Sequence, residues 1–207
     1  MTQKISRGLY LVTPDCRDTG ELLAGLQHAL GGHPALVQYR NKLAGDEARR
    51  EQAAAAAALA HEAGSLFIVN DSVELALDVS ADGVHIGRDD GDVAAVRAAI
   101  GPGRILGVSC YDEWDRAVQA VAAGADYVAF GAMFPSSVKP DAVRAPLELV
   151  RRAKAELGVP VCCIGGITLD NAPELVEAGA DMLAVISDVF RAPDPAARAA
   201  AIQALYE

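Results

Sequence analysis

Eight short apolar segments recur along the chain, and a helical segment or turn follows each of them. The segments are apolar on both faces, which is typical of strands buried in a parallel sheet rather than of half-exposed antiparallel strands. A strand, a helix and a second parallel strand form a crossover unit, so the carboxyl ends of neighbouring strands meet at one edge. The expected strands are Leu9–Val12, Ala35–Tyr39, Leu66–Val69, Gly83–Ile86, Ile105–Val108, Tyr127–Phe130, Val161–Ile164 and Met182–Ile186.

Helical spacing and capping residues predict the segments between these strands. We expect Asp46 to cap a long Ala-rich helix that Gly64 ends, and Ser187 to cap a short turn. Pro195 after Asp194 predicts the start of the final helix. The other expected helices are Glu21–Leu30, Ser72–Val79, Val93–Ile100, Glu113–Ala123, Pro146–Leu157 and Asn171–Ala178.

Eight strand–helix units in one domain, residues 1–207, predict a closed (β/α)₈ barrel, a TIM barrel, with its active site at the carboxyl ends of the strands. A weak internal repeat supports this prediction, because Ala81-Asp82-Gly83, Gly124-Ala125-Asp126 and Gly179-Ala180-Asp181 each precede an even-numbered strand. With 207 residues, 52% of them hydrophobic, and no Pro/Ser-rich linker, the chain fits a single domain. The alternative is an open doubly wound sheet, but the first turn lacks G-x-G-x-x-G.

The formal net charge is −10, and the sequence contains no block of like charges. Both properties disfavour binding to nucleic acid or to an anionic membrane. No apolar stretch reaches the roughly 20 residues of a membrane span, and the first residues lack the apolar core of a signal peptide, so we expect a cytoplasmic protein. Cys162 and Cys163 should face opposite sides of a strand, and buried thiols are favoured over a disulfide or zinc site. A homodimer is compatible with the sequence, which does not fix the oligomeric state.

Two acids stand at the tips of neighbouring strands. Asp71 follows the third strand and Asp90 follows the fourth, with the amide of Asn70 beside them. Parallel neighbours place these groups at the same end of the sheet. An oxygen-rich pair of carboxylates suits Mg²⁺, so the sequence predicts a magnesium site there.

The other strand tips predict two sites for anions. Arg40, Lys42 and Lys139 can neutralise a diphosphate beside the metal. Backbone N–H groups at Gly166 and Ser187, after the last two strands, match the place where many barrels bind a phosphate.

Each residue also has a simpler structural explanation. Asp71 and Asp90 each precede a helix, so either can be an N-cap. Arg40 and Lys42 can be solvated surface charges, and His85, inside an apolar strand, is better explained as a hydrogen-bonded structural residue than as a base or ligand. Caps alone, however, do not explain why basic residues and carboxylates gather at one rim.

Several motifs occur together and in order along nearly the whole chain. They are LYLVTP (Leu9–Pro14), VQYRNK (Val37–Lys42), FIVND (Phe67–Asp71), DGVHIGRDD (Asp82–Asp90), GVS (Gly107–Ser109), GADYVAFGAMFPSSVKP (Gly124–Pro140), IGGI (Ile164–Ile167) and VISDVF (Val185–Phe190). In these motifs the chain resembles the thiamine-phosphate synthase family. The resemblance implies a barrel enzyme that joins 4-amino-2-methyl-5-hydroxymethylpyrimidine diphosphate to hydroxyethylthiazole phosphate, or its carboxylated form, and releases pyrophosphate.

The resemblance also implies a role for each matching residue. One Mg²⁺ per active site helps the diphosphate leave through a dissociative, carbocation-like step, assisted by Arg40, Lys42, Ser109 and Lys139. By motif, Gln38 meets the pyrimidine; Arg40, Lys42, Asn70, Ser109 and Lys139 meet the diphosphate; Asp71 and Asp90 hold Mg²⁺; and Ser136, Gly166, Ile186 and Ser187 hold the thiazole phosphate.

Three positions depart from the family pattern. Val138 stands where many members have threonine, Arg88 replaces a frequent glutamine and adds positive charge near the metal, and Tyr111 stands where relatives often have histidine. The last departure disfavours the related thiazole tautomerase, which uses that histidine. Two hypotheses compete with the synthase: a metal-independent tautomerase and a noncatalytic thiamine-phosphate-binding protein.

Overall fold

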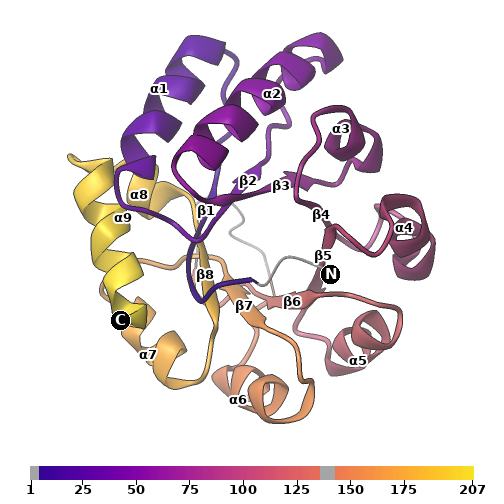
Figure 1. The fold of residues 1–207 in the computed structure, drawn as a ribbon. Helices are drawn as coiled ribbons and strands as arrows, with labels where there is room; N and C mark the ends of the chain where they lie inside the picture. Colours follow the sequence, from indigo (N-terminus) through magenta and orange to yellow (C-terminus); the bar gives the residue numbers. More distant parts are fainter. Residues whose placement is uncertain (1–4, 136–142) are drawn as a thin grey trace.

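The computed structural model describes residues 5–135 and 143–207 and shows a closed ring of parallel strands surrounded by helices (Figure 1). Neighbouring strands pair in chain order, and β8 pairs with β1. The predicted (β/α)₈ barrel is confirmed, and the open doubly wound alternative is wrong. The strands are β1 (Gly8–Val12), β2 (Leu36–Tyr39), β3 (Leu66–Asn70), β4 (Gly83–Ile86), β5 (Ile105–Tyr111), β6 (Tyr127–Phe130), β7 (Val161–Ile164) and β8 (Met182–Val185).

The helices form the outer layer. They are α1 (Thr19–Leu30), α2 (Asp46–Glu62), α3 (Val73–Asp78), α4 (Val93–Ile100), α5 (Trp114–Ala122), α6 (Leu147–Glu156), α7 (Ala172–Glu177), α8 (Ser187–Phe190) and α9 (Pro195–Gln203), followed by a 3₁₀ turn, Ala204–Tyr206. The long loop between β6 and α6 includes residues 136–142, so Ser136, Val138 and Lys139 lie outside the described residues.

Strand side chains alternate between two apolar layers, as the pleat requires. An inner cluster, which includes Tyr10, Ile68 and Met182, fills the barrel. A larger outer cluster lies between strands and helices. Cys162 belongs to the inner cluster and Cys163 to the outer one, and all four cysteines are free thiols, as the sequence predicts.

Three local predictions need correction. The N-cap residue of α2 is Gly45, which makes no side-chain hydrogen bond. Asp46 lies in the first turn, where its negative charge interacts favourably with the helix dipole. Ile186 is the N-cap residue of α8, so Ser187 is the first helical residue instead. Strand β5 continues to Tyr111 because a register shift between Ser109 and Tyr111 keeps the strand paired with β6 beyond the expected end. Two predictions are confirmed: α2 ends just before Gly64, where φ is +78°, and Asp194 caps the start of α9.

The three acids of the sequence repeat fasten the amino ends of the odd-numbered strands. Each accepts a hydrogen bond from a backbone N–H at the start of such a strand and pairs with a basic side chain of the helix before that strand. The sets are Asp82 with Phe67 N–H (2.7 Å) and His61 (2.8 Å), Asp126 with Leu106 N–H (2.8 Å) and Arg97, and Asp181 with Val161 N–H (3.0 Å) and Lys154 (2.7 Å). The repeat therefore ties helices to strands at the end of the barrel opposite the expected site.

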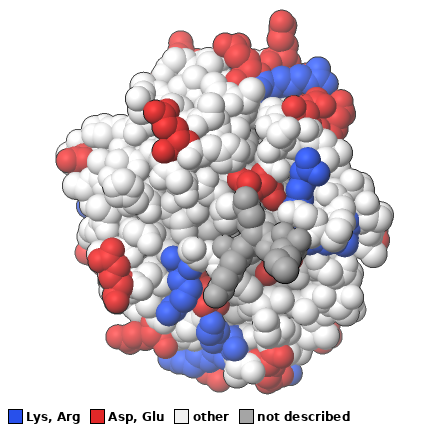
Figure 2. Space-filling view, viewed as in Figure 1, with Lys and Arg blue, Asp and Glu red and all other residues white. Residues whose placement is uncertain are grey.

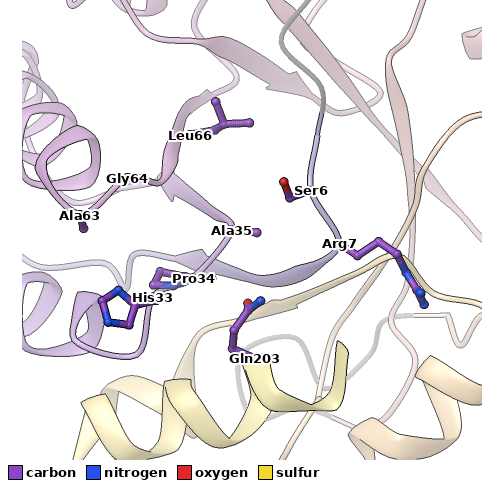
Figure 3. A pocket seen from close by; sticks show the side chains of 9 residues that line it. All are labelled: Ser6, Arg7, His33, Pro34, Ala35, Ala63, Gly64, Leu66 and Gln203. Atoms are coloured by element: carbon purple, nitrogen blue, oxygen red, sulfur yellow. The ribbon is translucent and has the colours of Figure 1, made fainter. Parts of the chain in front are cut away.

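The first strand is fastened differently, because Pro34 and Ala35 stand where the repeat would place its acid. Gln203 at the end of α9 accepts the Leu9 N–H at 2.8 Å, so the last helix holds the first strand. Figure 3 shows Gln203 reaching from α9 toward the start of β1, beside a cavity of about 480 Å³. This cavity lies at the amino end of the barrel, away from the predicted site residues.

On the face seen in Figure 2, acidic and basic side chains of the described residues are interspersed and form no single basic surface. This arrangement fits the net charge of −10. In residues 5–135 and 143–207, no helix is long and apolar enough to cross a membrane.

Replacement of Asp181 tests the fastening role of the repeat. Asp181 is 5% exposed and also lies 3.4 Å from Arg7, so Asp181→Ala leaves the Val161 N–H and the Lys154 ammonium without their buried acceptor. We expect the free energy of unfolding to fall by about 3 kcal/mol in urea denaturation. Glu148→Ala, which removes a solvent-exposed helix pair, should change it by less than about 0.5 kcal/mol. Equal effects of the two variants would contradict the assignment.

Candidate active site

The carboxyl ends of β2 to β5 bring the predicted polar residues to one rim. The parallel register pairs Gln38 with Ile68 and Asn70 with His85, which places the ends of these strands side by side. The residues gathered there are Gln38, Arg40 and Lys42 from β2 and its loop, Asn70 and Asp71 from β3, Asp90 after β4, and Ser109 from β5. The structure therefore brings these residues together at one rim.

Asp71 and Asp90 form a close pair of carboxyl groups. Burial, followed by a hydrogen bond and charge repulsion from Asp90, raises the pKa of Asp71 to about 6. The Lys42 ammonium lies 3.9 Å from Asp71, and the charges of Lys42 and Arg40 partly oppose that rise. Asp71 also has a positive φ of 66°, a backbone conformation that is uncommon for residues other than glycine.

The explanation of these two acids as helix caps is wrong. Ser72 caps α3, accepting the Leu75 N–H at 3.1 Å, and Asp92 caps α4, accepting the Ala95 N–H at 2.9 Å. Asp90 instead accepts the Gly87 N–H at 2.8 Å within its own loop. Neither acid of the pair is used to start a helix, so both remain available for a ligand.

Asp15, which sequence reasoning missed, organises the two basic residues after β2. Its carboxylate contacts the Arg40 guanidinium at 3.0 Å and accepts the Lys42 N–H at 2.6 Å. Burial alone would raise the pKa of Asp15, but the Lys42 N–H and the Arg40 charge outweigh it and lower the pKa. The hydroxyl of Thr13 also bonds the backbone of Arg40 at 2.9 Å. The sequence feature that could have revealed Asp15 is its position two residues after Thr13, at the tip of the first strand.

These contacts separate the two cations. The Arg40 side chain is 18% exposed and fixed, so the interpretation of Arg40 as a solvated surface charge is wrong. The Lys42 side chain is 59% exposed and remains free to move toward a ligand.

His85 is a structural residue in the sense predicted, since both ring nitrogens are hydrogen-bonded. Nδ1 lies 2.8 Å from the Tyr127 hydroxyl and Nε2 lies 2.8 Å from the Ser109 hydroxyl. Burial lowers the pKa of His85 to about 4, so the ring is neutral near pH 7. The Tyr127 hydroxyl also bonds Tyr10, which in turn accepts from Gln38. Sequence reasoning missed both tyrosines because each lies inside an apolar strand.

Two of the family departures contact each other. The Arg88 guanidinium lies 4.8 Å above the Tyr111 ring and pairs with Glu113, and the Arg88 N–H bonds the Tyr111 hydroxyl at 3.2 Å. The positive charge that Arg88 adds near the acid pair is thus matched by a carboxylate.

The loops after β7 and β8 lie together. Asp188 in α8 accepts the Leu169 N–H at 3.1 Å, which joins the two loops next to Gly166, Ile186 and Ser187. The Asn171 amide bonds the Gly166 carbonyl at 3.0 Å. Gly166 has φ of +66°, and a Cβ there would lie 2.5 Å from the Pro135 carbonyl oxygen, so only glycine fits.

The oxygen ligands present at this rim fit a hard divalent cation. Within the described ranges, no cluster of three or more His, Cys, Asp or Glu side chains is arranged to hold a metal. One or two carboxylates are nevertheless the usual protein ligands of Mg²⁺, which takes its other ligands from water and substrate phosphates. A divalent cation would also offset the repulsion between the two carboxylates. Asp71 and Asp90 are the residues that would hold it.

Comparison with known proteins decides the family. The family profile described as thiamine monophosphate synthase matches residues 9–189. The chain belongs to this family. It is 63% identical to the thiamine-phosphate synthase of Aromatoleum aromaticum and 62% identical to that of Azoarcus sp. strain BH72, with 97% of each chain covered in both cases.

A solved structure of thiamine phosphate pyrophosphorylase from Pyrococcus furiosus superimposes with a TM-score of 0.85 at 33% identity, covering 96% of this chain and 95% of that one. The predicted function is confirmed at the level of the reaction: the chain is a transferase of the thiamine-phosphate synthase type. The noncatalytic alternative is wrong, and the tautomerase alternative has no support from these relatives. Membership of the family is consistent with a metal-dependent enzyme.

The raised pKa of Asp71 predicts how stability depends on pH in metal-free protein. Because the folded pKa, about 6, exceeds the ordinary 3.8, this group's contribution to stability is present below about pH 4 and is lost as the pH rises to 6. In chelator at pH 8, Asp71→Asn should therefore unfold at a slightly higher temperature than wild type, with the difference shrinking toward pH 4. The gain should stay on the order of 1 kcal/mol or less, because the side chain is 35% exposed and water screens the repulsion.

The matched control for this measurement is Asp89→Asn. Asp89 is an exposed acid in the same loop as Asp90, and its loss should leave the melting temperature unchanged. A lower melting temperature for Asp71→Asn than for wild type at pH 8 would contradict repulsion between the pair.

Proposed function

We propose that the chain joins the pyrimidine methyl diphosphate to hydroxyethylthiazole phosphate with Mg²⁺ as cofactor, and that the rim formed by β2 to β5 is the diphosphate site. The observation that carries the proposal is the Asp71–Asp90 pair, whose crowded carboxyl groups lie beside Lys42 and Arg40. A diphosphate and a divalent cation together complement this arrangement of charges. Asn70, Ser109 and, from the sequence, Lys139 complete the proposed diphosphate set, and Gln38 is proposed to contact the pyrimidine.

The reaction needs stabilisation of a leaving anion rather than a nucleophilic side chain. The amino group of the pyrimidine delocalises positive charge at its methylene carbon, so the carbon–oxygen bond to diphosphate can break before the thiazole nitrogen attacks. Asp71 and Asp90 would hold Mg²⁺, which would supply positive charge for the leaving pyrophosphate. Arg40, held in place by Asp15 and Thr13, offers donors that need no reorganisation as charge develops. The thiazole nitrogen attacks through its own lone pair and requires no base.

The thiazole phosphate is proposed to bind where the loops after β7 and β8 meet. Gly166 lets the backbone pass close to residues 134 and 135, and Asp188 joins that loop to Ser187 and Ile186. Backbone N–H groups at such a place suit a phosphate, which then acts as a handle that orients the ring for attack. Ser136 is a further contact expected from the sequence.

Other properties rest on the sequence and stay predictions. They are a cytoplasmic location, a lack of nucleic-acid and membrane partners, and assembly as a homodimer.

The first test measures thiamine phosphate formed from the two substrates, with Mg²⁺ and then with excess chelator. Product should form only with the metal. Asp71→Asn and Asp90→Asn should each lower kcat/KM about 100-fold, because each removes a negative ligand at the leaving group. The control Asp89→Asn should stay within about twofold of wild type. Full activity of either site variant, or product in chelator, would refute the metal assignment.

The second test separates the two anion sites. Gly166→Ala would force the loop away from the Pro135 carbonyl, so we expect the KM for thiazole phosphate to rise roughly tenfold while the KM for the pyrimidine diphosphate changes little. Gly103→Ala is the control, since a Cβ at Gly103 meets nothing within 4 Å. An equal rise in both KM values would argue against a separate thiazole-phosphate site.

A further inference from the structure

A hydrogen-bond chain crosses the interior of the barrel. It runs from the Gln38 amide nitrogen to the Tyr10 hydroxyl (2.7 Å), on to the Tyr127 hydroxyl (2.8 Å), to Nδ1 of His85 (2.8 Å), and from Nε2 of His85 to the Ser109 hydroxyl (2.8 Å). These five residues come from β2, β1, β6, β4 and β5. We call them the interior chain.

The surroundings of the interior chain show that its polar groups are not incidental to packing. Its neighbours in the barrel are apolar, including Leu36, Ile68 and Ile105, so each polar group there must find a partner or be destabilising. Gly107 makes room for it, because a Cβ at that position would lie 2.1 Å from Cζ of Tyr127. The ring of His85 stacks on Tyr127 at 5.5 Å. A phenylalanine in place of either tyrosine would fill the barrel without requiring a partner, so packing alone does not explain the hydroxyl groups.

With the Gln38 amide nitrogen facing Tyr10, the direction of every bond follows if each hydroxyl hydrogen in the chain is to have a partner. The amide nitrogen of Gln38 can only donate, so the Tyr10 oxygen accepts, and the one hydrogen of Tyr10 is given to Tyr127. The hydrogen of Tyr127 is then given to Nδ1 of His85. His85 is buried and its two hydrogen-bond partners are neutral hydroxyl groups, which favours the neutral imidazole; because Nδ1 accepts from Tyr127, its single proton is on Nε2.

The direction has a consequence at each end. The Nε2–H of His85 donates to the Ser109 oxygen, which leaves the Ser109 hydrogen free to be donated outward. At the other end, Gln38 gives one amide hydrogen to Tyr10 and keeps its second amide hydrogen and the acceptor Oε1. If the amide were reversed, every bond would reverse and the Ser109 hydrogen would be consumed by His85.

We propose that the three inner members of this chain are positioning residues, which fix the Ser109 hydroxyl as a donor to the diphosphate and the Gln38 oxygen as an acceptor for the pyrimidine amino group. The two end contacts rest on the proposed function. Recognition of the heterocycle and stabilisation of the leaving group are thus coupled through neutral side chains, without movement of the backbone.

The direct test is the tautomer of His85, read from the ¹⁵N shifts of its two ring nitrogens and assigned by loss of the signals in His85→Asn. Wild-type protein should show the proton on Nε2 and an unprotonated Nδ1. This measurement uses no substrate, so it stands whether or not the proposed contacts are right. A proton on Nδ1 in the wild type overturns the proposal.

Replacement of the distant amide should reverse the chain. In Gln38→Glu at pH 9 the carboxylate can only accept, so Tyr10 must donate to it and the His85 proton should move from Nε2 to Nδ1. The matched control is Gln52→Glu, because Gln52 is equally buried and accepts from Tyr39 outside the barrel interior. The control should leave the His85 tautomer unchanged. A folded Gln38→Glu protein with an unchanged tautomer overturns the proposal.

A double-mutant cycle tests the action through Ser109. Tyr127→Phe should lower kcat/KM for the pyrimidine diphosphate about tenfold and leave the KM for thiazole phosphate within about twofold. In the Ser109→Ala background the same change should have little further effect, since the hydroxyl that the chain positions is gone. Additive losses would refute positioning through Ser109. Full activity of Ser109→Ala alone would instead refute the proposed substrate contact, while the tautomer result would stand.

Discussion

The pairing of β1 with β8 is the constraint on which the rest of the structure depends, because it closes a row of parallel strands into a ring. Four Cα pairs, from Gly8 with Met182 to Leu11 with Val185, join segments from opposite ends of the chain. In a closed ring all strands present their carboxyl ends at one rim. The loops after β7 and β8 therefore lie at the same rim as the acids and cations of β2 to β4.

The two rims use the same residue type for opposite purposes. At the amino end, Asp181 is nearly fully buried, and its carboxylate oxygens accept from a backbone N–H and from basic side chains. At the carboxyl end, Asp71 lies against another acid, and burial raises its pKa. The first arrangement stabilises the fold, whereas the second costs stability. Strain of this kind is concentrated at functional sites and is offset elsewhere, here by the fastened amino ends.

The sequence predicted the barrel and most of the rim because both follow from local patterns: two-sided apolar strands, and polar residues at their tips. It could not predict contacts between distant tips. Asp15 was missed because its partners, Arg40 and Lys42, follow a different strand. Ser72 and Asp92, not the adjacent Asp71 and Asp90, are the caps, and a shift of one or two residues is beyond what capping preferences resolve. Tyr10 and Tyr127 look like ordinary strand residues until the ring closes.

Burial has a common effect on the ionisable groups of this site. It favours the neutral form of both Asp71, whose pKa rises to about 6, and His85, whose pKa falls to about 4. A neutral His85 cannot supply the positive charge that a leaving diphosphate needs. Positive side chains at this rim are those of Arg40 and Lys42. A reaction whose nucleophile carries its own lone pair suits such a site, because it requires fixed positive charge and fixed hydrogen-bond directions but no titrating base.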